Sequence, residues 1–370
     1  MAAAPVLRQL HQRLPDSEII VSVTTPGGHE VASKMLGEII KWVIYTPFDT
    51  PDAVLRAVKT VQPDVFVNME TEIWPNLLYA VKRFGARSLL INGRISDKSI
   101  GAYKRFRPLF RWALSHFDRI LVQTALDAER FIEIGSTPDK VEVAGNAKFD
   151  DKTELLTAEQ VTELRSELKL PEGAPVLVVG STRSAEEERA IFTAVCLVRK
   201  EIPDLALVHA PRHIDRAAEV AGIMRQAGLS PVRRTELKEI TVPVTELILD
   251  TFGELARVYA VGAVSYAGNS LISGGTGQSP LQALAQGKPV LFGPYMSDQR
   301  DLAAMAAANN VGFEVHSAEE LASKIVELVR NKPELEAIKT RALKLIQANM
   351  GAALRYTNAV IKELQGKIAG

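Results

Sequence analysis

Short apolar runs rich in β-branched residues alternate with longer segments of helical period along the whole chain. The runs are apolar on both faces, which is typical of strands in a parallel sheet that helices cover on both sides. Amphipathic stretches such as 76–84 and 126–134 lie between them. The runs expected to form strands are 18–23, 42–45, 64–68, 88–92, 119–123, 141–144, 175–180, 205–209, 246–250, 263–267, 289–292 and 312–315.

This strand–helix alternation occurs twice, which predicts an α/β protein with two Rossmann-like domains. The polar stretch 150–173 has little strand character and marks the boundary as a partly helical linker. We therefore expect an N-terminal domain over 1–150, a C-terminal domain over 151–350 and a terminal helix over 351–370. Ligands bind such sheets at the carboxyl ends of their strands, so the two sheets are expected to face a central cleft.

The composition narrows the class of protein. Lys plus Arg and Asp plus Glu both total 44 in 370 residues, so the formal net charge is zero and the basic excess of a general nucleic-acid binder is absent. The single cysteine, Cys196, cannot form a disulfide within the chain and is expected to be a small buried side chain. No apolar run approaches the length of about 18 residues that crosses a bilayer. A cytoplasmic or membrane-peripheral protein is the expectation.

Two carboxylates and a tryptophan follow the third predicted strand, in the stretch METEIWPN. One interpretation is structural: Thr71 or Glu72 caps the next helix, Pro75 lies in its first turn, and Trp74 belongs to the core. The other is functional: Glu70 or Glu72 accepts a hydrogen bond from a sugar hydroxyl. The residues alone leave both open.

Polar loops also follow the fourth and sixth predicted strands. The first contains Asn-Gly, which predicts a turn from which Arg94 projects toward a ligand. The basic stretch 103–107 after it is either a solvated helix face or a contact for a phosphate or carboxylate. In the second loop, GNAKFD, Lys148 is expected to point toward the cleft, and Asn146 either shapes the turn or contacts substrate.

In the second half, GSTRSAEEE follows the strand 175–180. Its hydroxyls either cap the next helix or, at Ser181 and Thr182, help to hold an anion at the helix start. Arg212 lies at the exit of the strand 205–209, where an unpaired guanidinium favours a phosphate or carboxylate ligand.

A glycine-rich turn, SGGTGQSP, follows the strand 263–267 and precedes a predicted helix at 281–286. Glycines let backbone amides approach a ligand closely, and a helix N-terminus favours an anion. The residues expected to contact the ligand here are Gly274, Gly275, Gly277, Gln278 and Ser279.

Taken in order, these segments resemble the 3-deoxy-D-manno-octulosonic acid (Kdo) transferases, which have the two-Rossmann glycosyltransferase architecture called GT-B. The resemblance covers nearly the whole chain and is strongest from Glu70 to Met296. The matching stretches are ETEIWPN, NGRIS, GNAKFD, GSTRSAEEE, PRHIDR, DTFGELARVY, AGNS, PLQALAQGKPV with the glycine-rich turn before it, and FGPYM.

The resemblance implies an inverting transfer of Kdo from CMP-Kdo to a glucosamine hydroxyl of a lipid A precursor, without a metal or cofactor. It implies a place in lipopolysaccharide biosynthesis at the inner face of the inner membrane, where the surface near 103–112 would dock; buried core explains the same residues. The residues implied to hold CMP are Ser181, Thr182, Arg212 and 274–279. The residues implied to line the sugar and acceptor side are Glu70, Glu72, Arg94 and Lys148, with Glu70 and Lys148 supporting catalysis.

The chain departs from the family pattern in three places. The family's Ser-x-Gly-Glu loop, whose glutamate is the expected base, has no counterpart, and residues 1–10 look like the helix that follows it. The family glutamate expected at the ribose is Gln282, and an expected asparagine is replaced near 298–299. We therefore expect a chain without its first strand and true amino terminus, with no turnover by itself. The alternatives are a GT-B enzyme with another donor and a non-catalytic nucleotide-binding relative.

Overall fold

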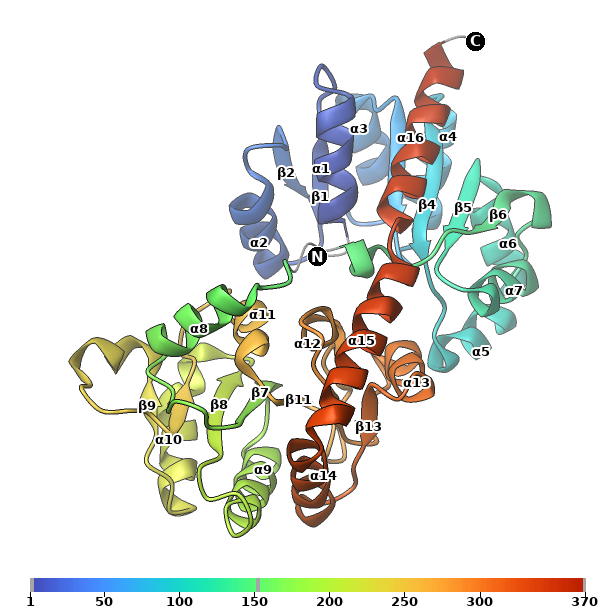
Figure 1. Cartoon of the computed structure of the whole chain (residues 1–370). Coiled ribbons are helices and arrows are strands. Elements are labelled where there is room, and N and C mark those ends of the chain that lie inside the picture. Colours follow the sequence, from blue (N-terminus) through green and yellow to red (C-terminus); the bar gives the residue numbers. More distant parts are fainter. Residues whose placement is uncertain (1–2, 151–153, 369–370) are drawn as a thin grey trace. The chain divides into compact units, whose positions relative to one another are not determined.

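The computed structural model describes residues 3–150 and 154–368, so residues 151–153 of the predicted boundary lie outside it. The chain divides into two compact units (Figure 1). Unit 1 comprises Met1–Lys152 and Asn349–Gly370, and unit 2 comprises Thr153–Ala348.

Unit 1 contains parallel strands only, among the residues that the structure describes. The strands are β1 (Ile20–Val23), β2 (Trp42–Tyr45), β3 (Val65–Met69), β4 (Arg87–Gly93), β5 (Arg119–Val122) and β6 (Val141–Val143). They form two hydrogen-bonded groups, a pair β1-β2 and a four-stranded sheet in the order β3-β4-β5-β6, rather than the single sheet of a simple Rossmann unit.

Helices cover both faces of the four-stranded sheet. Those of unit 1 are α1 (Ala4–Arg13), α2 (Pro26–Leu36), α3 (Pro51–Val61), α4 (Pro75–Arg83), α5 (Asp97–Arg105), α6 (Arg107–Ser115), α7 (Ala125–Glu133) and α16 (Ala352–Ile368), with 3₁₀ turns η1 (Pro138–Lys140) and η2 (Ala147–Asp150). Leu89 and Ile91 of β4 pack with α1 and α16, which lie side by side (Figure 1). Leu90 points to the other face, toward α6 and α7. This alternation is what a buried strand requires.

Unit 2 holds one seven-stranded parallel sheet in the order β13-β12-β11-β7-β8-β10-β9. Its strands are β7 (Val176–Thr182), β8 (Ala206–Pro211), β9 (Val232–Arg233), β10 (Glu246–Ile248), β11 (Val264–Ala267), β12 (Val290–Phe292) and β13 (Gly312–Glu314). Among the strands of the described residues, the prediction missed only β9, whose two residues are too few to form a recognisable apolar run.

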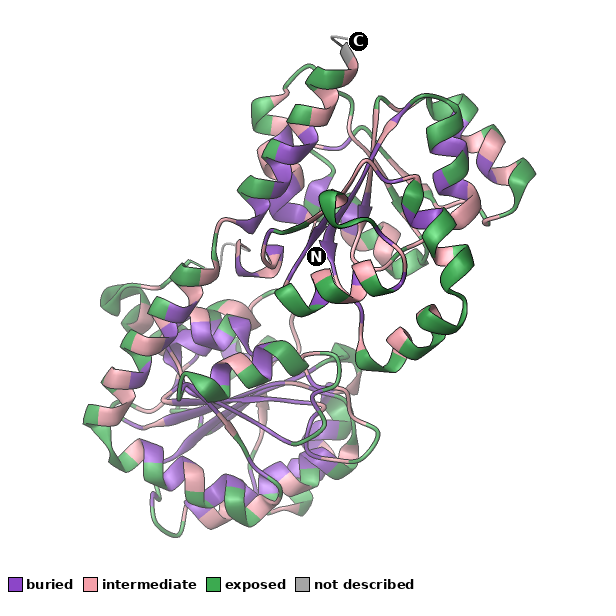
Figure 2. Ribbon diagram, turned by 90° about the vertical axis from the view of Figure 1, so that its right-hand side faces the viewer, coloured by how far each residue is buried: buried purple, intermediate pink, exposed green. Residues whose placement is uncertain are grey.

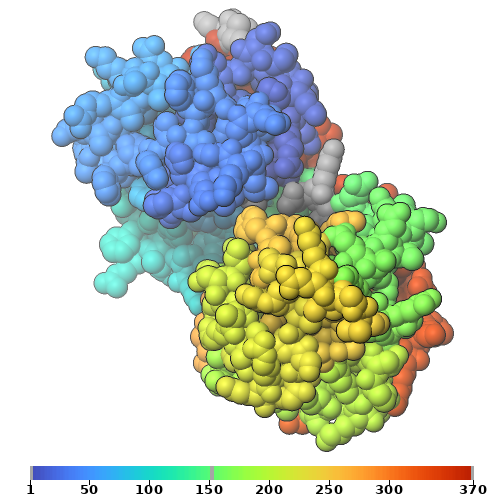
Figure 3. Space-filling model, turned by 90° about the vertical axis from the view of Figure 1, so that its left-hand side faces the viewer, coloured from blue at the N-terminus to red at the C-terminus, as the bar shows by residue number. Residues whose placement is uncertain are grey.

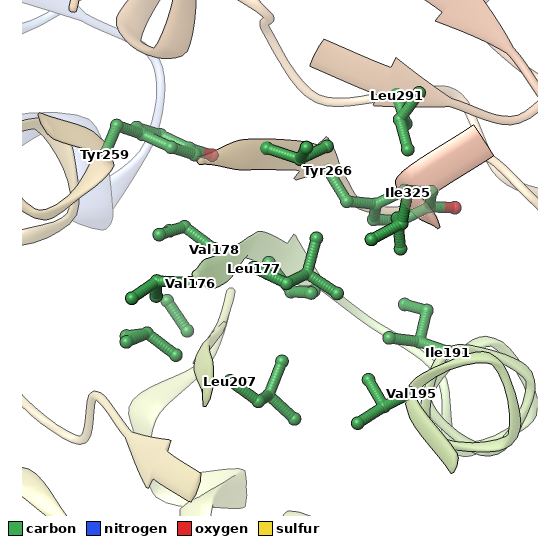
Figure 4. Close-up of a cluster of buried hydrophobic side chains, with 14 of the residues drawn as sticks. Val176, Leu177, Val178, Ile191, Val195, Leu207, Tyr259, Tyr266, Leu291 and Ile325 are labelled. Atoms are coloured by element: carbon green, nitrogen blue, oxygen red, sulfur yellow. The ribbon is translucent and has the colours of Figure 1, made fainter. Parts of the chain in front are cut away.

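The helices of unit 2 complete a single large core. They are α8 (Ala158–Glu167), α9 (Ala185–Val198), α10 (Ala217–Gln226), α11 (Leu255–Val258), α12 (Leu281–Ala285), α13 (Arg300–Ala308), α14 (Ala318–Arg330) and α15 (Lys332–Asn349), with 3₁₀ turns η3 (Ile214–Arg216), η4 (Arg234–Glu239) and η5 (Tyr259–Val261). Figure 4 shows Leu177 of β7 pointing toward Ile191 and Val195 of α9, whereas Val176 and Val178 point to the opposite side.

Burial follows the pattern expected for covered parallel sheets. Buried residues concentrate on the strands and on the inward faces of the helices, and exposed residues on the outward faces (Figure 2). The segments on either side of β10, yellow to orange in Figure 3, lie on the surface of unit 2 and carry the exposed Val242 and Phe252.

The tail forms two helices, α15 and α16, with a break at Gly351, whose φ is +93°. Asp150 caps the second of them, because its carboxylate accepts hydrogen bonds from the amides of Gly351 at 2.5 Å and Ala353 at 2.7 Å. The helix that the sequence sets apart as 351–370 therefore packs within unit 1.

Candidate functional site

The carboxyl edge of the unit 2 sheet brings together two of the predicted segments. Strand β7 lies between β11 and β8. The amide of Arg212, after β8, donates to the Thr182 carbonyl at 2.9 Å, and the amide of Gly268, after β11, donates to the Gly180 carbonyl at 2.8 Å. The Gln278 amide donates in turn to the Gly268 carbonyl at 3.0 Å. Arg212 and the glycine-rich turn therefore flank the end of one strand.

Arg212 presents a charge at this edge that the protein does not neutralise. Its side chain is exposed and makes no hydrogen bond or ion pair with any residue that the structure describes. A guanidinium in this state at the exit of a buried strand suits a planar, bidentate contact with a phosphate or carboxylate.

The glycine-rich turn, residues 273–280, uses three of its seven backbone amides for hydrogen bonds within the protein. The amides of Gly275 and Gly277 donate to the carbonyls of Ile272 and Asn269, as that of Gln278 does to Gly268. Gly277 has φ +79°, and a side chain there would collide with Met296. Within this turn, the amides that make no hydrogen bond to the described residues are those of Ser273, Gly274, Thr276 and Ser279. These four amides can donate to an anion.

A buried carboxylate fixes the loop from which this turn starts. Glu187, in the first turn of α9, is 1% exposed. It accepts hydrogen bonds from the amides of Asn269 at 2.7 Å, Ser270 at 2.8 Å and Leu271 at 3.1 Å, and from the Tyr266 hydroxyl at 3.0 Å. Burial and the neighbouring Glu187 charge raise the pKa of Tyr266, which keeps its hydroxyl a donor. The amides after β11 are thus occupied by the protein's own anion.

Thr182 differs from the prediction. Its side chain is fully buried, and its hydroxyl lies 2.8 Å from a Glu188 oxygen and 3.0 Å from the His209 Nε2. The hydroxyl therefore belongs to an internal network and does not face the edge where a ligand would bind. Burial, with a smaller contribution from Arg216, lowers the pKa of His209 to about 3, so the ring is neutral.

The remaining predicted residues of unit 2 lie near the same edge. Ser181 is half-buried with φ +62°, and Ser184, rather than Ser181 or Thr182, caps α9 by accepting from the Glu187 amide at 3.3 Å. Gln282 is exposed on α12. That helix has five residues and no side-chain cap, so it offers little of the dipole that the sequence suggested for anion binding.

Strand ends in unit 1 gather a second set of predicted residues. The Glu70 amide donates to the Ile91 carbonyl at 3.0 Å, and the Thr71 hydroxyl donates to the Arg94 carbonyl. The Lys148 Nζ lies 3.7 Å from a Glu70 oxygen. Glu70 has φ +58°, a left-handed conformation that is unfavourable for a residue with a side chain.

The turn after β3 corrects the structural interpretation of METEIWPN. Neither Thr71 nor Glu72 caps α4; Asp49 does, because its carboxylate accepts from the amides of Asn76 at 3.1 Å and Leu77 at 2.8 Å. Trp74 is 36% exposed rather than part of the core. Its indole nitrogen donates to Glu72 at 2.7 Å, so the pair presents an aromatic face with a held carboxylate.

Asn92 and Asn146 shape the two loops beside Glu70. Asn92 is buried with φ +55° at a register irregularity of β4, so Asn-Gly makes a bulge at the strand end rather than a turn after it. Its Oδ1 accepts from the Ala147 amide at 3.0 Å. Asn146 accepts from the Lys148 amide at 2.9 Å, which supports the turn-shaping alternative for that residue. Arg94 is half-buried at the end of this strand.

The sequence therefore located most residues of the two edges but missed the carboxylates that hold them. The sequence predicts no internal role for Glu187, Glu188 or Asp49. A signal for the first two existed: they lie on the apolar side of a helix whose neighbouring glutamate, Glu186, is exposed. No group of three or more His, Cys, Asp or Glu side chains among residues 3–150 and 154–368 is arranged to hold a metal ion. Among the helices of the same residues, none combines the length and apolar character needed to span a bilayer.

The chain is similar to known proteins in sequence and in structure. The family model described as "3-Deoxy-D-manno-octulosonic-acid transferase (kdotransferase)" matches residues 1–151. A 3-deoxy-D-manno-octulosonic acid transferase of Haemophilus influenzae is 28% identical over 370 residues, covering 100% of this chain and 85% of that protein. A bifunctional glycosyltransferase/methyltransferase of Fusobacterium nucleatum is 31% identical over 317 residues, or 85% of this chain. The aligned region is 48% of that bifunctional protein, about half its length.

Solved structures support the fold. HepE from Anabaena in complex with UDP has a TM-score of 0.64 at 14% identity, covering 99% of this chain and 96% of that one. A glycosyltransferase from Rickettsia africae has a TM-score of 0.63 at 14% identity, covering 98% and 94%. At such identities the likeness concerns the fold, which is the α/β fold of GT-B glycosyltransferases.

Proposed function

Because the chain belongs to the Kdo transferase family of GT-B glycosyltransferases, we propose that it transfers Kdo from CMP-Kdo to a hydroxyl of a lipid A precursor, with inversion. The observation that carries the donor assignment is the carboxyl edge of β11, β7 and β8. There, the unneutralised Arg212 lies across the end of β7 from a turn with unoccupied amides.

The donor site follows from the charge that the reaction creates. Departure of the sugar leaves negative charge on the CMP phosphate, and donors already aimed at that position stabilise the transition state. Arg212 supplies a fixed positive charge, and the amides of Gly274, Thr276 and Ser279 supply neutral donors. Ser181 lies at the same edge and contributes its hydroxyl. Thr182 contributes through its carbonyl, which holds the Arg212 amide at 2.9 Å.

We assign the sugar and acceptor side to the unit 1 edge. Glu70 and Glu72 provide carboxylate oxygens for sugar hydroxyls, and Lys148 provides a cation for the Kdo carboxylate. Arg94 completes the charged set at the end of β4. Trp74, held by Glu72, offers the flat apolar surface on which a sugar ring packs.

A lipid acceptor requires access to a bilayer, and we propose that α5 and α6 provide the contact. The residue between these helices, Phe106, is 56% exposed, and Leu109 and Trp112 on α6 are also exposed. Arg105, exposed on α5, adds positive charge beside them. Apolar and aromatic groups flanked by cations suit the interface of an anionic membrane leaflet. We propose that the protein acts at the inner face of the inner membrane.

Isothermal titration calorimetry of the full chain with CMP and with UDP tests the donor assignment. We expect CMP to bind more tightly than UDP, and Arg212→Ala to weaken CMP binding by about tenfold or more, because a hydrogen bond to a charged group contributes about 1.5–3 kcal/mol. Arg225→Ala, which removes an exposed arginine at the end of α10, is the matched control and should leave the affinity unchanged.

Two results would contradict the proposal. Preference for UDP would favour a GT-B enzyme with another donor. CMP binding that survives Arg212→Ala unchanged would place the nucleotide elsewhere.

A further inference from the structure

A second buried glutamate, Glu188, links α9 to the loop that carries Arg212. Glu188 is fully buried, one residue after Glu187. Both of its oxygens accept from the Arg216 guanidinium, at 2.8 and 2.9 Å, in a bidentate pair. One of them also accepts from the Thr182 hydroxyl at 2.8 Å. Glu219 is a further, more exposed partner of Arg216.

The segment between Arg212 and Arg216 is therefore held at both ends. At its start, the Arg212 amide donates to the Thr182 carbonyl, and at its end the Arg216 guanidinium is fixed by Glu188. The residues between them are exposed. Thr182 contacts Glu188 through its side chain and Arg212 through its backbone. Together with the pair between Glu188 and Arg216, these contacts hold both ends of one short loop.

The network also fixes His209. The Thr182 hydroxyl has one proton and gives it to the Glu188 carboxylate, so the His209 Nε2, 3.0 Å away, must be the donor to Thr182. The His209 Nδ1 is then an acceptor, and it makes no hydrogen bond to the described residues. The chain His209–Thr182–Glu188–Arg216 thus has a defined direction of donation.

We propose that Glu188 is a positioning residue for the donor site: it holds the 212–216 loop so that the Arg212 guanidinium meets the nucleotide phosphate. This inference rests on the proposed function. A buried ion pair is costly to desolvate, and apolar side chains of similar volume would serve stability as well. What the pair adds is a fixed position for the loop, since its bidentate geometry admits little displacement.

A double-mutant cycle on the full chain tests this inference. CMP and cytidine are titrated by calorimetry into the wild type, Glu188→Gln, Arg212→Ala and the double variant. We expect Glu188→Gln to weaken CMP binding by about tenfold, within the range seen for coupled sites, and to leave cytidine binding unchanged, because cytidine has no phosphate. In the Arg212→Ala background, Glu188→Gln should have no further effect on CMP.

The neighbouring Glu186 is exposed on the same helix turn, so Glu186→Gln provides a matched control that should bind CMP as the wild type does. If Glu188→Gln does not fold, Thr182→Val removes the hydroxyl of the same network, and Thr182→Ser restores it. Loss of CMP affinity in the first and its recovery in the second would then support the inference.

The outcomes separate the inference from the proposed function. Effects of Glu188→Gln and Arg212→Ala that add independently, or an equal loss of cytidine and CMP affinity, would overturn the positioning role while leaving the donor assignment intact. A wild type that binds no CMP would overturn both.

Discussion

The two sheet edges are organised by different means. In unit 2, fully buried carboxylates hold the loops: Glu187 binds three successive amides after β11, and Glu188 binds Thr182 and Arg216. In unit 1, the charged residues of the edge are themselves partly exposed, and Glu70 meets Lys148 at 3.7 Å. The loops there are held by the neutral Asn92 and by the half-exposed Asp49.

The two edges differ in the residues that fix the conformation of their loops. Hydrogen bonds to a buried charge are strong and expensive to leave unmade, so the unit 2 edge is rigid before any ligand arrives. An exposed ion pair contributes little and adapts easily. Under the proposed function, the preformed unit 2 edge would bind a small, constant nucleotide, and the adaptable unit 1 edge would bind a larger acceptor.

The largest expected loss of stability results from replacing Glu187. Glu187→Ala leaves three amides without a partner, two of them buried, and leaves Ser270 as the remaining partner of the Tyr266 hydroxyl. This should lower the stability of unit 2 by about 3–5 kcal/mol. The equivalent change in unit 1, Asp49→Ala, removes a helix cap and should cost about 1 kcal/mol. Native-state hydrogen exchange, measured separately for the amides of each unit, gives both values. Equal losses in the two units would show that the edges are held alike.

An intermediate loss of stability is expected at low pH, because His209 is buried in the neutral form. Its folded-state pKa, about 3, lies below the ordinary value of 6.5, so the unfolded state binds more protons between these values, and unit 2 loses stability as the pH falls through 6.5. The loss should be about 2 kcal/mol between about pH 8 and pH 5.

His209→Gln keeps a donor for Thr182 but does not titrate, so it should remove this loss, whereas His213→Gln, at an exposed site, should not. Hydrogen exchange of unit 2 amides at the two pH values provides the measurement. His116 of unit 1, half-buried, has a pKa lowered by burial and by Lys82 and Lys140, so unit 1 should lose stability in the same direction. An unchanged pH dependence in His209→Gln would refute the assignment.

The smallest change in stability is expected when Glu70 is replaced by glycine. Its left-handed backbone costs about 1–2 kcal/mol, and glycine relieves that strain at an entropic cost of up to about 1 kcal/mol. The ion pair with Lys148 contributes at most about 1 kcal/mol. Glu70→Gly should therefore leave the stability of unit 1 unchanged or slightly higher. Glu72→Gly, at a residue without positive φ, should lower it; the same loss in both variants would show that Glu70 is not strained.

Much of the fold could be predicted from the sequence, because covered parallel strands leave an unmistakable apolar signal. Strand β7 begins with four consecutive apolar residues and is predicted from them, whereas β9 has two residues and is not. The pairing of β1 with β2 apart from the other strands could not be predicted, since apolar runs identify strands but not their neighbours.

A site residue could be predicted where its type is unusual at that position in a strand or loop. It could not be predicted where contacts with residues distant in the sequence decide whether its side chain is buried or exposed. Arg212 after a buried strand was recognisable as a ligand-binding candidate. The buried state of Thr182 was not, because it depends on Glu188 and on His209, which comes from another strand. Asp49 likewise caps a helix that begins 26 residues later in the chain, at Pro75.

The most direct test of the account is a crystal structure of the full chain with CMP. The account predicts that the CMP phosphate lies within hydrogen-bond distance of the Arg212 guanidinium and of at least one amide among Gly274, Thr276 and Ser279. CMP bound at any other edge, with Arg212 left in solvent, would contradict it.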